Sequence, residues 1–561
     1  MLRSKSVSRA VLGPGQDVHE HGSVNMSELL LGDEAVGLAA IDAGISGAFS
    51  YPGTPATEIF EFIEARTRGS DTIVAKWSPN EKVAYEEALG MSYAGRRSLV
   101  SMKHVGLNVA ADPFMNSAIT GAHGALVLVV ADDPGMHSSQ NEQDSRIYGD
   151  FASVPMFEPS NQQEAYNMTR EAFELSESLG LPVLTRLVTR LAHSRAQVQT
   201  AAPCEPKEVN KPLDYRDWTL LPVNARRRYR RLIALQSKLR EHSEQSSFNQ
   251  LELKGPKGII ASGIANNYVR EVIGHDSTYS LLKIGAYPVP TRLVRDLINH
   301  CEDIVIFEDG FPYIETQVNG LFGVPGTAIR GKRSGLIPMD GELSAERIRA
   351  GLGMQQLESL EPATDLPGRP PRLCDGCPHC DTFKAMLEAV GQDTSPTLFS
   401  DIGCYTLGAL PPYNAVHSCV DMGSSISMAL GAAKAGVHPI VCTIGDSTFI
   451  HSGMTGLIGA ACEDANMTVI ILDNATVGMT GGQDIFVTGE DLVRVVKGLG
   501  VKEEHLVVIN PVPKQHEKNT ELFRREINHR GLSVIIACRP CIQVTRKIAQ
   551  EKSKAENRKP K

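Results

Sequence analysis

The chain has 561 residues, of which 42% are hydrophobic and 22% charged, and its formal net charge at pH 7 is −9. This composition is typical of a soluble globular protein of about three or four domains, and the negative charge gives no reason to expect nucleic acid as a partner. The longest clean apolar run, residues 125–131, is too short to span a membrane and the polar N-terminus has no signal-like core, so a cytoplasmic protein is expected.

The first part of the chain alternates between helix-like and strand-like segments. Residues 26–200 have the alternation of a parallel α/β domain, whereas residues 1–25 and the lysine-rich residues 547–561 are expected to be disordered tails. Expected strands lead into Thr54 and into Lys103-His104. Because parallel strands bring their carboxyl ends to one edge of a sheet, these three residues are expected to line a pocket there. The alternative is ordinary strand-end polarity.

The middle of the chain predicts a linker and a second, smaller domain. Residues 201–256 lose the alternation and contain the basic run 226–231, which is more typical of a solvated helix face than of a partner-binding patch. Alternation resumes over residues 257–355 and predicts a second α/β domain. Residues 326–332 have the glycine–lysine spacing of a phosphate-binding loop, but Arg333 replaces the Ser or Thr that would hold Mg²⁺, so nucleotide binding is not expected.

A strand–helix–strand unit organises the third domain, residues 370–546. One strand, residues 440–444, ends in Gly445-Asp446, and another, residues 469–472, ends in Asp473-Asn474. Asp446 and Asn474 therefore share a sheet edge, where their oxygen atoms suit Mg²⁺. A diphosphate could complete the site, helped by the turn at Gly445 and by a helix that begins near Ser452. The alternative is an ordinary unit with a polar rim.

Cysteine spacing gives a second chemical signal. Among 11 cysteines, Cys374 and Cys377 form a C-x2-C pair, and Cys404 and Cys541 each follow an expected strand, so the four could converge on one metal centre. Four thiolates suit Zn²⁺ or a [4Fe–4S] cluster, and spacing does not choose between them. Free thiols are the simpler interpretation for Cys419, Cys442 and Cys462, while Cys380 and Cys538 leave the fourth ligand open.

Six segments, in order along the chain, carry a resemblance to a known family. Gly445-Asp446-Ser447 with Asp473-Asn474 looks like the thiamine diphosphate motif, usually written GDG with a paired Asn downstream; Ser447 and Asp473 are departures from it. Together the segments resemble the 2-oxoacid:ferredoxin oxidoreductases, most closely the large subunit of the indolepyruvate enzymes. They are residues 51–55, 80–84, 103–113, 374–379, 401–405 and 445–483.

The resemblance implies a fold and cofactors. The fold is an α/β thiamine diphosphate-binding fold: a pyrimidine-binding domain (26–200) and a diphosphate-binding domain (370–546), both doubly wound parallel sheets, plus a transketolase-C-terminal-like domain (257–355). The cofactors are thiamine diphosphate, Mg²⁺ and one [4Fe–4S] cluster, with coenzyme A as co-substrate. The residues placed against the coenzyme are Gly53, Thr54, Glu81, Gly423, Ser424, Ser425, Gly445, Asp446, Ser447, Asn474, Thr476, Met479 and Thr480.

The resemblance also implies residue roles. Glu81 is the acid on the coenzyme's pyrimidine, unless it is a surface glutamate at a helix start, and Thr54, Lys103 and His104 complete the catalytic set. Mg²⁺ is held by Asp446, Asn474 and the Thr476 carbonyl. Gly423, Ser424 and Ser425 face the diphosphate. The resemblance places the ligands of an iron–sulfur cluster at Cys374, Cys377, Cys404 and Cys541, and it therefore favours iron–sulfur over zinc.

The implied reaction is oxidative decarboxylation of an aryl-type 2-oxoacid, such as indolepyruvate, to acyl-CoA and CO₂. The alternative among enzymes is a non-oxidative 2-oxoacid decarboxylase. The alternative outside enzymes is a non-catalytic structural or regulatory subunit. The family usually continues into a ferredoxin-like domain after Cys541, and this chain does not, so electrons are expected to leave through ferredoxin or a separate iron–sulfur protein. A smaller subunit and a dimer of large subunits are expected. The family usually carries a basic residue at the position of Cys380, so this departure leaves the substrate preference undecided.

Overall fold

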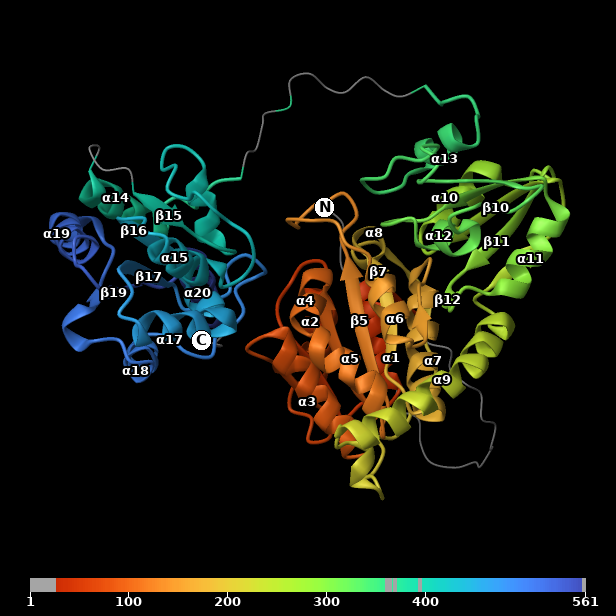
Figure 1. The fold of residues 1–561 in the computed structure, drawn as a ribbon, viewed down its shortest axis with the longest axis horizontal. Helices are drawn as coiled ribbons and strands as arrows, with labels where there is room; N and C mark the ends of the chain where they lie inside the picture. The colour runs from red at the N-terminus through yellow and green to blue at the C-terminus, as the bar shows by residue number, and fades with distance from the viewer. Residues whose placement is uncertain (1–26, 359–365, 367–370, 392–395, 557–561) are drawn as a thin grey trace.

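The computed structural model describes residues 27–358, 366, 371–391 and 396–556, so the expected tail 1–25 lies outside the described residues. Three α/β units follow one another along the chain, each built on its own mainly parallel sheet (Figure 1). The α/β fold class expected from the sequence is confirmed. Within the described residues, no helix is both long and apolar enough to cross a bilayer.

The first unit contains a seven-stranded sheet of order β12-β6-β7-β5-β4-β2-β3, in which only β12 is antiparallel to its neighbour. Strands β4, β5 and β7 are buried throughout, because helices cover both faces of the sheet. The strands are β2 (Gly47–Ser50), β3 (Val74–Trp77), β4 (Ser98–Lys103), β5 (Leu126–Asp132), β6 (Met156–Phe157), β7 (Val183–Val188) and β12 (Ala286–Tyr287). The helices are α1 (Gly32–Asp42), α2 (Thr57–Thr67), α3 (Glu81–Tyr93), α4 (His104–Val109), α5 (Ala111–Thr120), α6 (Ser145–Ala152), α7 (Gln162–Leu179) and α8 (Thr189–Ala192). A separate ribbon pairs β1 (Ser27–Leu31) with β8 (Arg195–Gln199).

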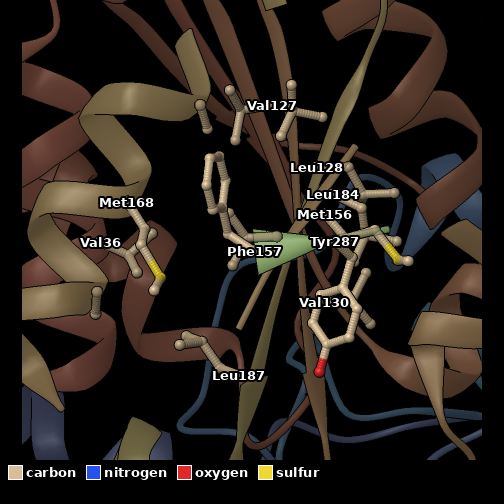
Figure 2. Packing of buried hydrophobic residues seen from close by; sticks show 14 of the residues in the cluster. Val36, Val127, Leu128, Val130, Met156, Phe157, Met168, Leu184, Leu187 and Tyr287 are labelled. Atoms are coloured by element: carbon tan, nitrogen blue, oxygen red, sulfur yellow. The ribbon is translucent and has the colours of Figure 1, made fainter. Parts of the chain in front are cut away.

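One hydrophobic core joins the first unit to the second. The strand β12 comes from the second unit's part of the chain, and its residue Tyr287 packs among Met156, Phe157 and Val130 of the first sheet (Figure 2). The second sheet has the order β14-β13-β10-β11-β9. Its strands are β9 (Gln250–Glu252), β10 (Lys257–Ser262), β11 (Tyr279–Ile284), β13 (Asp303–Phe307) and β14 (Ala328–Arg330), with helices α10 (Ala265–Ile273), α11 (Thr291–His300), α12 (Tyr313–Asn319) and α13 (Ala345–Gly351).

The region expected to be a linker, residues 201–256, contains a 24-residue helix, α9 (Pro222–Gln245). The basic run is only partly a solvated face. Arg228 donates to the carbonyl of Ile119 at 3.1 Å, and Arg231 donates to that of Leu179 at 2.7 Å, at the last turns of α5 and α7. Cations are favourable at helix C-termini, where carbonyls lack partners. The helix α9 is therefore packed against the first unit.

The third unit has a fully parallel sheet of order β15-β16-β17-β19-β18. Its strands are β15 (Thr397–Phe399), β16 (Ile440–Gly445), β17 (Met467–Asp473), β18 (Leu506–Ile509) and β19 (Leu532–Cys538). Its helices are α14 (Pro378–Val390), α15 (Ser424–Lys434), α16 (Asp446–Thr448), α17 (Met454–Cys462), α18 (Glu490–Gly498), α19 (His516–Ile527) and α20 (Ile542–Glu556).

Two boundaries of the third unit differ from the sequence-based expectation. The helical segment after β16 begins at Asp446, directly after the strand, and not near Ser452; a π-helical turn, Phe449–Gly453, joins α16 to α17. Helix α20 continues to Glu556, where a disordered tail was expected from residue 547. Its Lys, Glu, Gln and Ala residues are good helix formers, and neither Gly nor Pro interrupts them.

Candidate active site

A pocket of about 480 Å³ lies between the first and third units. The segments after β2, β3, β4 and β5 form one wall, and the loops after β15, β16 and β17 form the other. Both sheets thus present the carboxyl ends of parallel strands to one cavity. The hydroxyls of Tyr51 and Ser447 are hydrogen-bonded at 2.8 Å, and Gln483 Nε2 donates to Glu61 Oε1 at 2.7 Å, so the two walls are in direct contact within one chain.

Glu81 is the buried acid on the first wall. It is 6% exposed, at the start of α3, where the Asn80 side chain accepts the Val83 N–H and caps the helix. Its Oε2 lies 2.7 Å from His451 Nε2, and Asn80 Nδ2 donates to the His451 carbonyl at 3.0 Å. His451 lies in the π-helical turn, a feature that is frequent at functional sites. A carboxylate bonded to an imidazole can hold or pass a proton at the pocket surface.

Gly106 leaves the space that the Glu81 side chain occupies, since a Cβ at Gly106 would come within 2.6 Å of Glu81 Cγ and Oε1. We expect Gly106→Ala to displace this carboxylate and lower kcat about 100-fold, because a misplacement of roughly 1 Å costs that much. Fold and coenzyme content should be unchanged. Gly90→Ala on α3, where an added Cβ meets nothing within 4 Å, is the matched control for steady-state kinetics. Equal activity of the two variants would contradict a positional role of Glu81.

Lys103 and Thr54 line the pocket, as expected, and His104 lies behind its wall. Lys103 donates to the Ser138 carbonyl at 2.7 Å, and burial lowers the pKa of its ammonium to about 8, against an opposing effect of Asp133. His104 is 1% exposed, and its Nε2 lies 3.2 Å from the Asn141 side-chain oxygen. Asn141 itself lines the pocket, so this amide connects the His104 imidazole to the cavity wall.

Asp446 is the central acid of the second wall. It is 2% exposed and accepts the N–H groups of Ser447, Asn474 and Ala475 at 2.7–3.0 Å. Burial, and then the neighbouring carboxylate of Asp473, raise its pKa to about 8. Asp473 accepts from the Thr488 hydroxyl and the Gly489 N–H. Two buried carboxylates side by side are unfavourable unless a proton or a cation offsets their charge, which is what a divalent ion would do.

Asn474 extends the same edge and is held by a buried histidine. Its Nδ2 lies 3.3 Å from Nε2 of His379, and burial lowers the pKa of His379 to about 4, so the imidazole is neutral and accepts. The Thr476 N–H donates to Asn474 Oδ1 at 3.1 Å, and Thr476 also lines the pocket. Side-chain and backbone oxygens of this loop therefore stand beside Asp446, and such oxygens suit Mg²⁺.

Gly423, Ser424 and Ser425 do not line the pocket, in contrast to the expectation that they face a diphosphate; Met422 does. A Cβ at Gly423 would lie 2.6 Å from the Ser452 side chain, and Ser425 donates its hydroxyl to Asp401 at 2.6 Å. Gly423 therefore packs against Ser452, and Ser425 forms a buried hydrogen bond with Asp401. The sequence alone did not indicate either contact.

The four cysteines of the expected cluster gather beside the pocket. Burial raises the pKa of Cys404 to about 11, and Cys541 and Cys374 add to this electrostatically. Burial raises the pKa of Cys377 to about 12, and Cys380, Cys404 and Cys374 add to this in that order. Cys404 also lines the pocket. Cys538 instead lies beside Asp473, which raises its thiol pKa after burial. Cys541, and not Cys538, lies beside Cys404, and the extra thiol Cys380 lies beside Cys377.

The pocket joins most of the residues singled out from the sequence. Those lining it are Gly53, Thr54, Glu81, Lys103, Cys404, Gly445, Asp446, Ser447, Asn474, Thr476, Met479 and Thr480. Sequence reasoning missed Tyr51, Asn141, His379 and His451. The available signal for His451 was that it is the only His, Asp, Glu, Lys or Arg residue between Asp446 and Cys462, and the C-x2-C-P-H context was the signal for His379.

Both halves of the pocket match known families. Residues 38–229 match a family described as "Pyruvate flavodoxin/ferredoxin oxidoreductase, thiamine diP-bdg", and residues 401–537 match "Thiamine pyrophosphate enzyme, C-terminal TPP binding domain". The fold and the pocket together define a thiamine diphosphate-dependent enzyme.

Curated relatives give a closer assignment. The indolepyruvate oxidoreductase subunit IorA of Archaeoglobus fulgidus is 38% identical over 551 residues, covering 91% of this chain and 86% of that protein. The subunit of the same name from Pyrococcus abyssi is 36% identical over 563 residues, covering 91% and 85%. A solved 2-oxoglutarate:ferredoxin oxidoreductase from Magnetococcus marinus covers 58% of this chain and 65% of its own at 15% identity, with a TM-score of 0.47. The chain belongs to the family of indolepyruvate oxidoreductase subunit IorA, and it is an oxidoreductase.

Proposed function

We propose that the protein catalyses the oxidative decarboxylation of an aryl-type 2-oxoacid, such as indolepyruvate, to an acyl-CoA and CO₂. The observation that carries this proposal is one pocket lined by Glu81 from the first unit, by Asp446 and Asn474 from the third, and by Cys404 of the cysteine group. The substrate class rests on the names of the relatives, which are indolepyruvate oxidoreductase subunits.

The pocket fits thiamine diphosphate with Mg²⁺. Its volume of about 480 Å³ is in the usual range for small-molecule sites, about 300–1,000 Å³. The Asp446 and Asn474 side chains and the Thr476 carbonyl would hold Mg²⁺, and the ion would offset the buried charge beside Asp473. When bound, the coenzyme supplies a carbanion that attacks the ketone of a 2-oxoacid and lets CO₂ leave.

Glu81 and Lys103 have separate tasks in this proposal. Glu81 exchanges a proton with the coenzyme's pyrimidine nitrogen, and His451 orients its carboxylate through the 2.7 Å contact. Lys103 and Asn141 line the same cavity and offer donors for the substrate carboxylate. Tyr51, whose hydroxyl is bonded to Ser447, closes the seam between the walls and keeps water from the reacting atoms.

Cys374, Cys377, Cys404 and Cys541 would hold one [4Fe–4S] cluster that takes the electrons. The position of Cys404 in the pocket wall favours a redox cluster next to the coenzyme over a purely structural Zn²⁺.

Replacing Cys404 with serine tests this metal assignment. We expect anaerobically purified wild-type protein to be brown with about four irons per chain, and Cys404→Ser to lose most of this iron and all dye reduction. Cys462→Ser, at an exposed thiol on α17, is the matched control. A colourless wild-type protein with one zinc per chain would contradict the redox assignment and leave the thiamine site standing.

The reaction is tested with the complex that contains the companion smaller subunit. Under anaerobic conditions, a panel of aryl, branched and short 2-oxoacids is supplied with coenzyme A and a low-potential dye. Dye reduction and acyl-CoA formation that are fastest with arylpyruvates are the expected result. Aldehyde without dye reduction would identify the alternative, a non-oxidative decarboxylase, and a complex without thiamine diphosphate would identify a non-catalytic subunit. The proposal includes a dimer of large subunits and transfer of electrons to ferredoxin or to a separate iron–sulfur protein.

A further inference from the structure

A second cluster of possible metal ligands lies in the first unit, outside the pocket described above. Asp33 from the start of α1, Glu58 from the start of α2 and His193 from the end of α8 have ligand atoms that all lie within 4.8 Å of one another. No other group of three His, Cys, Asp or Glu residues in the described part of the chain meets this spacing. The cluster therefore differs from the scattered surface acids of the molecule.

Within the described part of the chain, Asp33 has no partner for its charge. Its side chain is fully buried, and neither carboxylate oxygen has a hydrogen-bond partner among the described residues. Although it is the second residue of α1, it does not bond the free N–H groups of that helix start. The Glu58 side chain is 37% exposed, but its Oε2 atom is buried and has only the His193 imidazole, at 3.5 Å, beside it. Such groups cost free energy when left unpaired, so an unpartnered carboxylate aimed at another carboxylate indicates a missing cation or proton.

His193 is placed to balance the charge of Glu58, but among the described residues no hydrogen-bond donor reaches Asp33. Burial, then Glu58, then Glu34 raise the pKa of Asp33 well above its ordinary range. His193 is the group placed to respond: its Nε2 stands 3.5 Å from Glu58 Oε2, and Glu58 and Asp133 raise its pKa. The backbone around the cluster is fixed, because a Cβ at Gly32 would lie 2.3 Å from the Leu191 carbonyl, so α1 begins in direct contact with α8.

We propose that Asp33, Glu58 and His193 bind one divalent transition-metal ion, of the Zn²⁺ type, that ties together the starts of α1 and α2 and the end of α8. Two carboxylates and one imidazole are a ligand set for such an ion, and the remaining position takes water. The imidazole, whose side chain is 35% exposed, supplies the small movement that closes the set and gives the ion a path from solvent.

The ion has a structural consequence for the coenzyme pocket. Glu58 follows Thr57, whose hydroxyl accepts the Gly53 N–H at 3.0 Å, and Gly53 lines the pocket. Fixing the first turn of α2 thus fixes the loop that carries Gly53 and Thr54. The three ligands of this site are neither coenzyme ligands nor cluster cysteines, so its metal content can be tested separately from the reaction proposed above.

Two explanations of the unpaired Asp33 carboxyl are a bound metal ion and a bound proton, and the metal content of the protein distinguishes them. Anaerobically purified holoenzyme is treated with a chelator, restored with Mg²⁺ and thiamine diphosphate, dialysed against a small excess of Zn²⁺, and analysed for zinc, iron and thiamine diphosphate per chain. The variants are Asp33→Asn and His193→Asn. The matched control is His516→Asn, since His516 also pairs with a glutamate, Glu388 at 2.7 Å, but has no third acid within the cluster spacing.

We expect wild type and His516→Asn to carry about one zinc per chain more than Asp33→Asn and His193→Asn, at equal iron and coenzyme content. The melting temperature of wild type should rise by about 5 °C or more at a 100-fold excess of Zn²⁺ over its Kd, and that of His193→Asn should not. Equal zinc in all four proteins would overturn the proposal. If Asp33→Asn does not fold, the comparison of His193→Asn with wild type still decides the result, because His193 is partly exposed and its replacement should not disturb the fold.

Discussion

Glu81→Gln is expected to slow release of CO₂ from a 2-oxoacid by about 100-fold to 10,000-fold, the range for loss of a general acid–base group. Glu81 is buried at the start of α3, faces the pocket, and bonds His451 from the opposite wall. Glutamine keeps the size and one oxygen of the side chain but cannot exchange a proton. Single-turnover ¹⁴CO₂ release measures the step, and bound thiamine diphosphate should remain at wild-type levels.

The control for this variant is Glu86→Gln on the same helix. Glu86 is solvent-exposed and forms an i,i+4 ion pair with Lys82, which contributes little to stability. It should leave CO₂ release within about two-fold of wild type, as surface substitutions generally do. Unchanged turnover of Glu81→Gln would remove Glu81 from the mechanism, and loss of the coenzyme would instead assign it to binding.

The elements that position this site follow closely from the sequence, because buried parallel strands are short, continuous apolar runs. The strands β16 and β17 lie within two residues of the expected ranges 440–444 and 469–472, and β4 ends at Lys103, where a strand end was expected. The extent of α9 was missed, although its basic run was expected to be a helix face, and α20 was missed entirely, because both sequences are charged and lack a wide apolar stripe. Arg228 and Arg231 stabilise α9 against the ends of other helices, and such long-range contacts leave no periodic signal.

The site was predictable where a residue directly follows a strand, as Asp446 and Asn474 do. It was not predictable where two distant elements meet. The contact between His451 and Glu81, and that between His379 and Asn474, depend on how the units and α14 are docked. Asp33, Glu58 and His193 are similar: each sits at a helix end in an unremarkable sequence, and only the packing of α1, α2 and α8 brings them together.

Asp446→Asn is expected to lower the affinity for Mg²⁺ and thiamine diphosphate by more than about 100-fold, since even groups that only support metal ligands cost 10- to 100-fold. Asparagine can still accept the N–H groups of Asn474 and Ala475, so the loop should keep its shape. Calorimetric titration of the cofactor-free protein measures the affinity. Asp491→Asn, at an exposed position on α18, is the control, and near wild-type binding by Asp446→Asn would contradict the assigned role.

The same carboxylate makes cofactor binding depend on pH. Because burial and Asp473 raise the pKa of Asp446 to about 8, its side chain is mainly protonated in the cofactor-free protein at neutral pH, and Mg²⁺ must displace that proton. Affinity should therefore rise about tenfold per pH unit from pH 6 to pH 8 and level off above it, as linkage requires for one proton released. The cofactor affinity of Asp446→Asn is measured in the same buffers. Its pH dependence comes from the coenzyme itself and is subtracted from that of the wild type. An affinity of wild type that is flat from pH 6 to pH 8 after this subtraction would mean that the proton is not held by Asp446.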